Sequence, residues 1–361
     1  MMGLTLWRYL FRRYLVVTGW FVLGMVALIF LVDFTEFASR ISGHENYTIG
    51  LGIKLSILRL PGIIQVTAPF VILFSAMTLL LMLNRRYELV VARSTGVSAW
   101  QFLSPLCVAS LLIGIFLITA INPLSARALA IVHGYEVSLG MQRGTVGEIE
   151  RTPWLRQRTN EGVTIIGAET IAERGLLLGG AKFIRFNEDG EIIERLDAET
   201  AELQDGQWVL SNVNRVAGPG PAEIKSAVIQ TNLNPRAVEE SLAAPEAVSF
   251  FELPDKIEVA RSFGLGANAF AMQYQSLLAL PLLLVAMTLI AATVSLKFIR
   301  FGQSVGIILA GILAGFLLYV VSVLAKAFGT AGTVPPFVAA WLPVIVAMAL
   351  GVTVLLHKED G

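Results

Sequence analysis

Cysteine and charge are both scarce in this chain of 361 residues. Cys107 is the one cysteine, which excludes an intramolecular disulfide and a zinc site built from paired cysteines. Charged residues make up 15% of the sequence against 55% hydrophobic residues, and the mean hydropathy is +0.70. This composition is too apolar for an ordinary soluble domain.

Motifs that carry enzyme chemistry are also missing. The histidines His44, His133 and His357 are isolated in the sequence and lack the spacing of a zinc site. A phosphate-binding loop needs Gly-Lys-Ser/Thr at its end, and the nearest match, in residues 175–183, lacks the final hydroxyl. We therefore expect no catalytic residue, no metal site and no cofactor bound by this chain.

Long apolar runs are the dominant feature of the sequence. Six occur, three on each side of a polar block formed by residues 122–262: Leu15–Val32, Pro61–Leu83, Phe102–Ile121, Phe270–Leu296, Val305–Phe328 and Phe337–Leu356. Each run is long enough to cross ~30 Å of hydrocarbon, which takes about 20 helical residues. Because backbone amides in lipid must bond within their own segment, we expect six transmembrane helices.

Positive charge in the short loops predicts the orientation, because such loops stay in the cytoplasm. The loop after the fifth run, residues 329–336, has no charge. We therefore expect both termini in the cytoplasm and the polar block outside it. The basic residues that mark the cytoplasmic loops are Arg8, Arg12, Arg13, Arg85, Arg86, Arg93, Lys297 and Arg300.

The polar block has the pattern of β structure. Short runs rich in β-branched and aromatic residues are separated by turn signals such as Asp205-Gly206, which favours a two-layer, jelly-roll-like β domain. Residues 125–142 predict a connecting helix, and residues 254–263 are either a short amphipathic helix or a plain linker. The predicted strands are Val163–Ile166, Lys182–Phe186, Glu191–Leu196, Trp208–Val213 and Lys225–Ile229.

These patterns divide the chain into three parts. Residues 1–121 hold the first three transmembrane helices, residues 122–262 the β domain with its flanking connector helices, and residues 263–361 the last three helices. Lys326 lies near the outer end of the fifth run, where it either anchors the helix at the interface or contacts an anionic ligand. Asp33, Glu36 and Arg40 leave the same two interpretations open.

The loop between the second and third runs, about residues 84–96, carries the clearest functional signal. It places apolar Leu89, Val90 and Val91 between charged residues and ends at Gly96, a residue typical of a helix C-cap. One interpretation is a short helix parallel to the membrane, of the kind by which a transporter permease docks on a separate ATPase. The other is a solvated turn whose arginines only follow the positive-inside rule.

Several motifs together resemble one family. They are Tyr87–Val91 with Gly96, Leu31–Asp33 at the end of the first run, the central β block, and Val334–Pro336 followed by Trp341–Pro343. On these points, and over essentially the whole chain, the sequence resembles the LptF/LptG permeases that export lipopolysaccharide from Gram-negative bacteria. The Glu-Leu-Val-Val form of the loop is more similar to LptG than to LptF.

The resemblance implies an inner-membrane heterodimer of an LptF-like and an LptG-like subunit on a dimer of the ATPase LptB, which alone binds ATP and magnesium. It also implies a V-shaped cavity open to the outer leaflet, and a periplasmic jelly roll that passes lipopolysaccharide to the bridge proteins LptC and LptA. Arg85 and Arg86 belong to the implied docking site. Glu88 matches the acidic residue that meets a basic ATPase surface, with Leu89 and Val90 in the adjacent groove.

Lipopolysaccharide has many acyl chains and anionic phosphates, and each buried CH₂ contributes about 0.8 kcal/mol. We therefore expect an apolar cavity wall that includes Phe30, Phe34, Phe316 and Tyr319. Basic rim residues would hold phosphates through charge-assisted hydrogen bonds, and the candidates are Arg40, Lys54, Arg59 and Lys326.

One segment departs from the family pattern. Family members carry lysines at and beyond the outer end of the first span, whereas this chain has Asp33 and Glu36 there. Either the partner subunit supplies the phosphate contacts or the lipid is less phosphorylated. An alternative function uses the same layout: a membrane scaffold, or a mechanotransmitting subunit, whose exported domain binds partner proteins without lipid passage.

Overall fold

The computed structural model describes the chain in thirteen segments, and every structural statement here concerns those residues. They are 4–41, 49–94, 96–138, 155–159, 162–168, 170–172, 177–187, 191–204, 206–216, 221–231, 245–262, 267–295 and 304–359. They fall into two compact units. One holds the apolar helices together with residues 246–251, and the other holds the strands and the segment 252–270.

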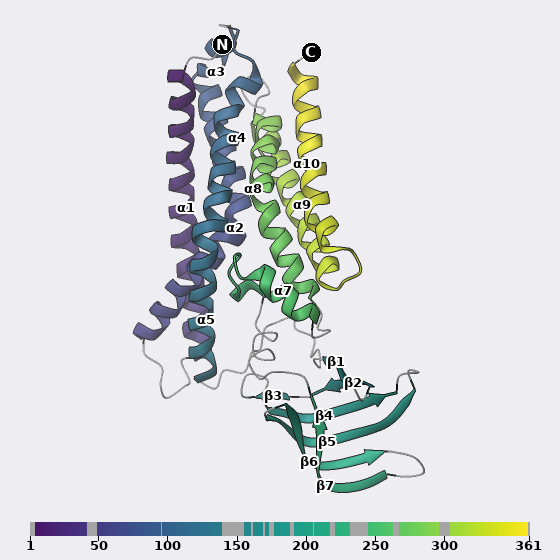
Figure 1. Ribbon diagram of the computed structural model, residues 1–361. Coiled ribbons are helices and arrows are strands. Elements are labelled where there is room, and N and C mark those ends of the chain that lie inside the picture. Colours follow the sequence, from purple (N-terminus) through teal and green to yellow (C-terminus); the bar gives the residue numbers. More distant parts are fainter. Residues whose placement is uncertain are drawn as a thin grey trace. The chain divides into compact units, whose positions relative to one another are not determined.

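The helical unit confirms the six transmembrane spans. Within the described residues, six helical stretches have the length and apolar character needed to cross a membrane. Figure 1 shows the start of α1, the short helix α3 and the end of α10 at one end of this unit, called the terminal end below. The spans are formed by α1 (Leu4–Ile41), α2 (Ile49–Arg85), α4 (Ala99–Phe116) with its continuation, α8 (Asn268–Ser295), α9 (Ser304–Thr330) and α10 (Pro336–Glu359).

The third span does not end at Asn122-Pro123 as the sequence suggested. α4 passes through a π-helical turn, η1 (Leu117–Ile121), directly into α5 (Asn122–Ser138). The Asn122 side chain is buried; its amide group donates to Gln65 (3.3 Å) and its oxygen accepts from the backbone N–H of Phe250 (2.7 Å). A polar side chain satisfied in this way stabilises a continuous helix at a point where proline alone predicts a break.

The helices differ in how much of their surface they bury. α2 and α8 lie at the centre of the unit, with most of their apolar windows buried, whereas α1 and α9 leave most of theirs exposed. Close approach of small residues helps to pack the centre. A Cβ atom added at Gly114 of α4 would lie 2.5 Å from the Cα atom of Pro281 in α8, so only glycine fits at this crossing.

Buried hydroxyl groups join four of the helices. The Tyr14 hydroxyl of α1 hydrogen-bonds Ser110 of α4 (2.9 Å), and Ser110 in turn hydrogen-bonds Thr288 of α8 (2.7 Å). One turn further along α1, Thr18 donates to Ser75 of α2 (3.0 Å). Such bonds between membrane helices contribute about 0.6 kcal/mol each on average. They fix α1 against its neighbours near the terminal end.

The second unit is built on one antiparallel sheet, which confirms the all-β prediction. Its strand order is β1-β2-β4-β5-β6-β7, with β3 paired to β4. All five predicted strands occur, and β1 and β3 were missed because both are short and polar or irregular in pattern. The strands are β1 (Leu155–Thr159), β2 (Gly162–Gly167), β3 (Thr170–Ala172), β4 (Leu177–Phe186), β5 (Ile192–Gln204), β6 (Gln207–Val216) and β7 (Pro221–Gln230).

The described strands belong to a single antiparallel sheet, which is consistent with the inserted β domain expected from the sequence. A line of irregular residues crosses three strands: Gly180 (φ +60°) in β4, Glu199 in β5 and Asn212 (φ +52°) in β6. The ladder skips these positions, and the Asn212 amide donates to the Glu199 carboxylate (2.6 Å).

The buried face of each strand changes phase at this line. In β5 the buried apolar residues Leu196 and Ala198 are followed by Ala201 and Leu203, three positions on in place of two. A left-handed residue within a strand produces such a change of direction. The buried residues on both sides of this line belong to one apolar core around Trp208.

The structure also resolves the two interpretations of residues 254–263. α7 (Leu253–Ser262) is a helix whose apolar Leu253 and Ala260 are buried while Asp255 and Glu258 are exposed. The segment is therefore an amphipathic helix and not a plain linker.

The contact between Gly114 and Pro281 predicts a large effect of a side chain at residue 114. We expect Gly114→Leu to lower the thermal unfolding midpoint of the detergent-solubilised protein by about 5 °C, because overpacking costs about 1–3 kcal/mol. Gly24→Leu is the matched control, since nothing lies within 4 Å of a Cβ atom added at Gly24. Equal midpoints for the two variants would contradict the close crossing of α4 and α8.

Candidate functional site

The predicted loop helix is present. α3 (Glu88–Ser94) lies between α2 and α4, at the terminal end of the helical unit. Tyr87 has a φ of +59° and ends α2, and its carbonyl oxygen accepts the N–H of Val91 in the first turn of α3. On the far side Gly96 has a φ of +81°, and the Ser98 hydroxyl caps α4 by accepting the N–H of Gln101 (3.2 Å). Tight turns at both ends therefore hold α3 as a separate short helix.

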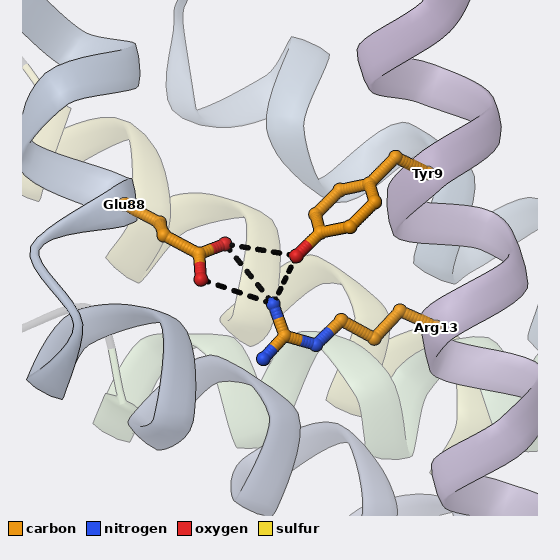
Figure 2. Close-up of polar contacts among 3 residues, drawn as sticks. All are labelled: Tyr9, Arg13 and Glu88. Atoms are coloured by element: carbon orange, nitrogen blue, oxygen red, sulfur yellow. Dashed lines mark hydrogen bonds and ion pairs between the residues drawn. The ribbon is translucent and has the colours of Figure 1, made fainter.

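Glu88, the first residue of α3, binds two side chains of α1 (Figure 2). The Arg13 guanidinium donates from one nitrogen to both carboxylate oxygens, at 3.0 and 3.1 Å, and the Tyr9 hydroxyl donates to one of them at 3.2 Å. Arg13 also donates to the Tyr9 hydroxyl and lies 5.5 Å from the centre of the Tyr9 ring. The carboxylate is therefore held by a charge-assisted cluster within the chain.

The exposure of the loop residues corrects part of the predicted docking site. Leu89 is 4% exposed and packs in the same apolar cluster as Leu10 and Tyr14 of α1, so it does not fill a groove on a separate protein. Leu89 follows charged Glu88 on this short helix, so the two side chains point in different directions. The side chain of Leu89 points toward the core because membrane helices cover that side of α3. The side chain of Val90 lies outside the described residues.

The outward surface of the loop consists of other residues. Arg85 and Arg86 are exposed, as the docking interpretation requires. Tyr87 is 64% exposed and Val91 62%, and sequence reasoning did not place either in the site. Their signal was present: residues 87 and 91 are four apart, so they share one face of a helical turn opposite Leu89. We define the outward surface as Arg85, Arg86, Tyr87 and Val91.

The four basic rim candidates do not form one cluster. Arg59 of α2 pairs with Asp33 of α1, with Nη1 3.5 Å from Oδ1. Lys54 donates to the hydroxyl of Tyr135 in α5 (2.9 Å) and lies over its ring. Arg40 lies in α1, but its side chain is outside the described residues. Arg59 and Lys54 are thus engaged by groups of their own chain, and so is the fourth candidate, Lys326.

Lys326 has partners that the sequence could not reveal. Its ammonium donates to the side-chain oxygen of Gln273 in α8 (2.9 Å) and lies 3.7 Å from the carboxylate of Glu246. Gln273 is buried, so the lysine satisfies a polar group inside the helical unit. This contact supports the interpretation of Lys326 as an anchoring residue.

The aromatic candidates fall into two groups. Phe30 and Phe34 stack on each other along α1, with ring centres 6.1 Å apart, and Phe316 of α9 is exposed. Tyr319 instead packs on Phe70 of α2 at 4.7 Å and is partly buried in the core. Tyr319 therefore joins α9 to α2, and it does not line an open wall as predicted.

An apolar groove along α8, α9 and α10 was not foreseen. It has a volume of about 570 Å³ and, apart from Thr293, its lining offers no side-chain hydrogen-bonding group. The groove forms between three consecutive helices, so it can be recognised only once their packing is known. Its lining includes Ile290, Leu317, Val321, Phe328, Leu342 and Leu350.

Among the described residues, no group of three or more His, Cys, Asp or Glu side chains could hold a metal ion. The features found are a membrane bundle with two exposed helices, a short helix at its terminal end and an inserted antiparallel sheet. This combination defines the chain as an α-helical membrane protein with an inserted β domain.

The chain belongs to the LptF/LptG family of lipopolysaccharide export permeases. The family model described as "Lipopolysaccharide export system permease LptF/LptG" matches residues 8–357. The chain is also similar to the lipopolysaccharide export system permease protein LptG of Escherichia coli strain K12, with 24% identity over 346 residues, 93% of each chain. The LptG protein of Escherichia coli O6:H1 matches with the same identity and coverage. The predicted family is confirmed, and both relatives are LptG proteins.

The Arg59–Asp33 pair predicts a change in the thermal unfolding midpoint when the pair is broken. Asp33 Oδ2 is buried without a hydrogen-bond partner among the described residues, so the carboxylate depends on Arg59 for compensation. We expect Arg59→Gln to lower the unfolding midpoint by about 3–6 °C, because it leaves this partly buried charge uncompensated. The double variant Asp33→Asn with Arg59→Gln should recover most of that loss, while Lys54→Gln should change little. A double variant less stable than Arg59→Gln alone would contradict the pairing.

Proposed function

We propose that this chain is a permease subunit of an ATP-driven lipopolysaccharide exporter, and that it works with a separate ATPase. The observation that carries the proposal is α3: a distinct short helix in the loop between the second and third spans, with an outward surface that no part of the described chain covers. Membership of the family supports lipopolysaccharide as the transported lipid.

The orientation in the membrane follows the basic loops. Arg8, Arg12 and Arg13 precede or open the first span, and Arg85 and Arg86 lie beside α3 at the same end. In the bacterial inner membrane, the positive-inside rule predicts that the terminal end faces the cytoplasm. The β unit would then lie in the periplasm. An ATPase in the cytoplasm can reach α3 in this orientation.

The outward surface suits a docking role. Tyr87 and Val91 offer apolar contact area, and Arg85 and Arg86 offer positive charge around it. An apolar centre with a charged rim is the usual composition of a protein interface. Glu88 lies at the edge of this surface with 34% of its side chain exposed, so its carboxylate is shared between α1 and any basic group of the ATPase.

Lipid extraction needs apolar walls that replace the leaflet. α1 and α9 leave most of their apolar surface exposed, and exposed Phe316 together with the stacked Phe30 and Phe34 offers such a wall. Pairing with an LptF-like subunit would enclose these faces in a cavity, from which movement driven by ATP hydrolysis expels the acyl chains. ATP and magnesium bind the LptB-like ATPase dimer, and the β unit hands the lipid to LptC- and LptA-like bridge proteins.

The rim of this cavity contains fewer available cations than the resemblance implied. Asp33 neutralises Arg59, and Glu246 lies beside Lys326. We infer that the partner subunit supplies a large share of the phosphate contacts, or that the exported lipid is less phosphorylated. Both versions leave the apolar wall as the main contribution of this chain.

Docking through the outward surface predicts a selective loss. We expect Val91→Asp to reduce recovery of the ATPase with the affinity-purified permease by at least about tenfold, because an unpaired charge would be buried in the interface. Val216→Asp is the matched control, since it introduces the same change at an exposed valine of the β unit. Full recovery of the ATPase with Val91→Asp would remove α3 from the docking role.

Lipid passage predicts contact at partly exposed Phe34 of α1 and exposed Phe316 of α9. A photo-crosslinking amino acid at Phe34 or Phe316 should capture lipopolysaccharide in the assembled complex, and the yield should fall when ATP is added. The same amino acid at Ile345, exposed on α10, serves as the control. If neither position captures lipid while the β unit still binds its partner proteins, the scaffold function is favoured instead.

A further inference from the structure

The polar contacts printed for the start of α3 are with one helix, α1. Glu88 binds Tyr9 and Arg13, and Leu89 packs in the cluster that contains Leu10 and Tyr14. Tyr9, Leu10, Arg13 and Tyr14 follow the i, i+1, i+4, i+5 pattern and form one face of α1. Glu88 thus joins α3 to one face of α1, about two turns after the helix begins, while Leu89 packs in a core that several helices share.

The polar part of this attachment has the features of a specific contact. Arg13 is 15% exposed, so its interaction with Glu88 is less screened than that of a surface pair. The Tyr9 ring lies beneath the guanidinium and its hydroxyl reaches the same carboxylate, so one arginine and one tyrosine jointly orient Glu88. Figure 2 shows both side chains reaching from α1 toward the start of α3.

α1 differs along its length in how firmly it is held. Tyr14 and Thr18 fix the part next to α3 through hydrogen bonds to Ser110 and Ser75. Over the next three turns, a small cavity of about 40 Å³ separates α1 from its neighbours and weakens packing there. Beyond it, Asp33 pairs with Arg59. The cavity is lined from α1 by Val22, Met25, Val26 and Ile29 and from α2 by residues that include Leu60, Ile63, Ile64 and Thr67.

We propose that Tyr9 and Arg13 are positioning residues that attach the docking helix α3 to α1, so that a displacement of α3 by the ATPase is passed to α1. This proposal rests on the proposed function, because it takes α3 as the ATPase contact. Its physical basis is the charge-assisted contact of Glu88 with Arg13 and Tyr9, which joins α3 to α1, the helix that bears the apolar wall for lipid. In this role Glu88 acts inside the permease as well as at its surface.

The test uses the full complex of both permease subunits, the ATPase and lipopolysaccharide in proteoliposomes. Three quantities are measured for each variant: recovery of the ATPase, the rate of ATP hydrolysis, and the lipopolysaccharide released per ATP hydrolysed. We expect Arg13→Gln to retain ATPase recovery but to lower lipid release per ATP by about fivefold, the loss that one partly buried ion pair accounts for. Tyr9→Phe should lower the same ratio by about twofold, because it removes one neutral hydrogen bond.

Arg12→Gln is the matched control. Arg12 is the neighbouring arginine on α1 and its side chain is exposed, so loss of its charge should leave the ratio unchanged. The conservative variant Arg13→Lys keeps a positive charge beside Glu88 and should recover lipid release per ATP relative to Arg13→Gln. Such recovery separates transmission from a general effect on folding.

Two outcomes would overturn the inference. One is a normal ratio of lipid release to ATP hydrolysis in both Arg13→Gln and Tyr9→Phe. The other is a loss of ATPase recovery in Arg13→Gln with a normal ratio in the complex that remains, since Arg13 would then serve docking alone. Failure of the proposed function has a different signature, because the ATPase would then be recovered in full with Val91→Asp.

Discussion

Helices in lipid gain no free energy from burying apolar surface against each other, because the lipid chains are equally apolar. The helical unit therefore depends on close contacts and a few hydrogen bonds at its centre, where Gly114 meets Pro281 and where Tyr14, Ser110 and Thr288 are joined. α1 joins these contacts through Tyr14 and Thr18 but, like α9, leaves much of its apolar surface unburied. In the proposed function these surfaces face a partner subunit and lipid.

α1 has two roles, which follow from its position in the helical unit. Near the terminal end it is fixed by hydrogen bonds and by Glu88 of α3, and further along it presents the Phe30 and Phe34 rings. Asp33 of the same helix pairs with Arg59 of α2, so α1 is held at both places. In the proposed function the chain contributes this wall and a docking helix, and a separate ATPase contributes the energy.

Much of the fold was predictable from local patterns. The six spans follow from the length of apolar runs, and five strands follow from β-branched runs between turns, because both signals lie within single segments. The change of buried face within the strands was not predictable, since it depends on left-handed residues such as Asn212 inside a strand, which no periodicity shows. The continuous third span likewise depends on the partners of Asn122, which are distant in sequence.

The candidate site was predictable in position but less so in its individual residues. The loop helix was found, yet Leu89 is buried and Tyr319 packs on Phe70, because burial in a short helix or a span depends on which neighbours cover it. The ion pair of Arg59 and Asp33 and the cluster of Tyr9, Arg13 and Glu88 join different helices, so no single segment announces them. Family membership supplied the lipid and the partners, which no residue pattern in the chain identifies.

The central claim is that this permease converts work done by a separate ATPase at α3 into release of lipopolysaccharide. Its most direct test is ATP-dependent release of lipopolysaccharide from proteoliposomes that contain the permease subunits, with and without the ATPase. The account predicts release only when ATPase and ATP are both present, and no ATP hydrolysis by the permease alone. Release without the ATPase, or hydrolysis by the isolated permease, would contradict it.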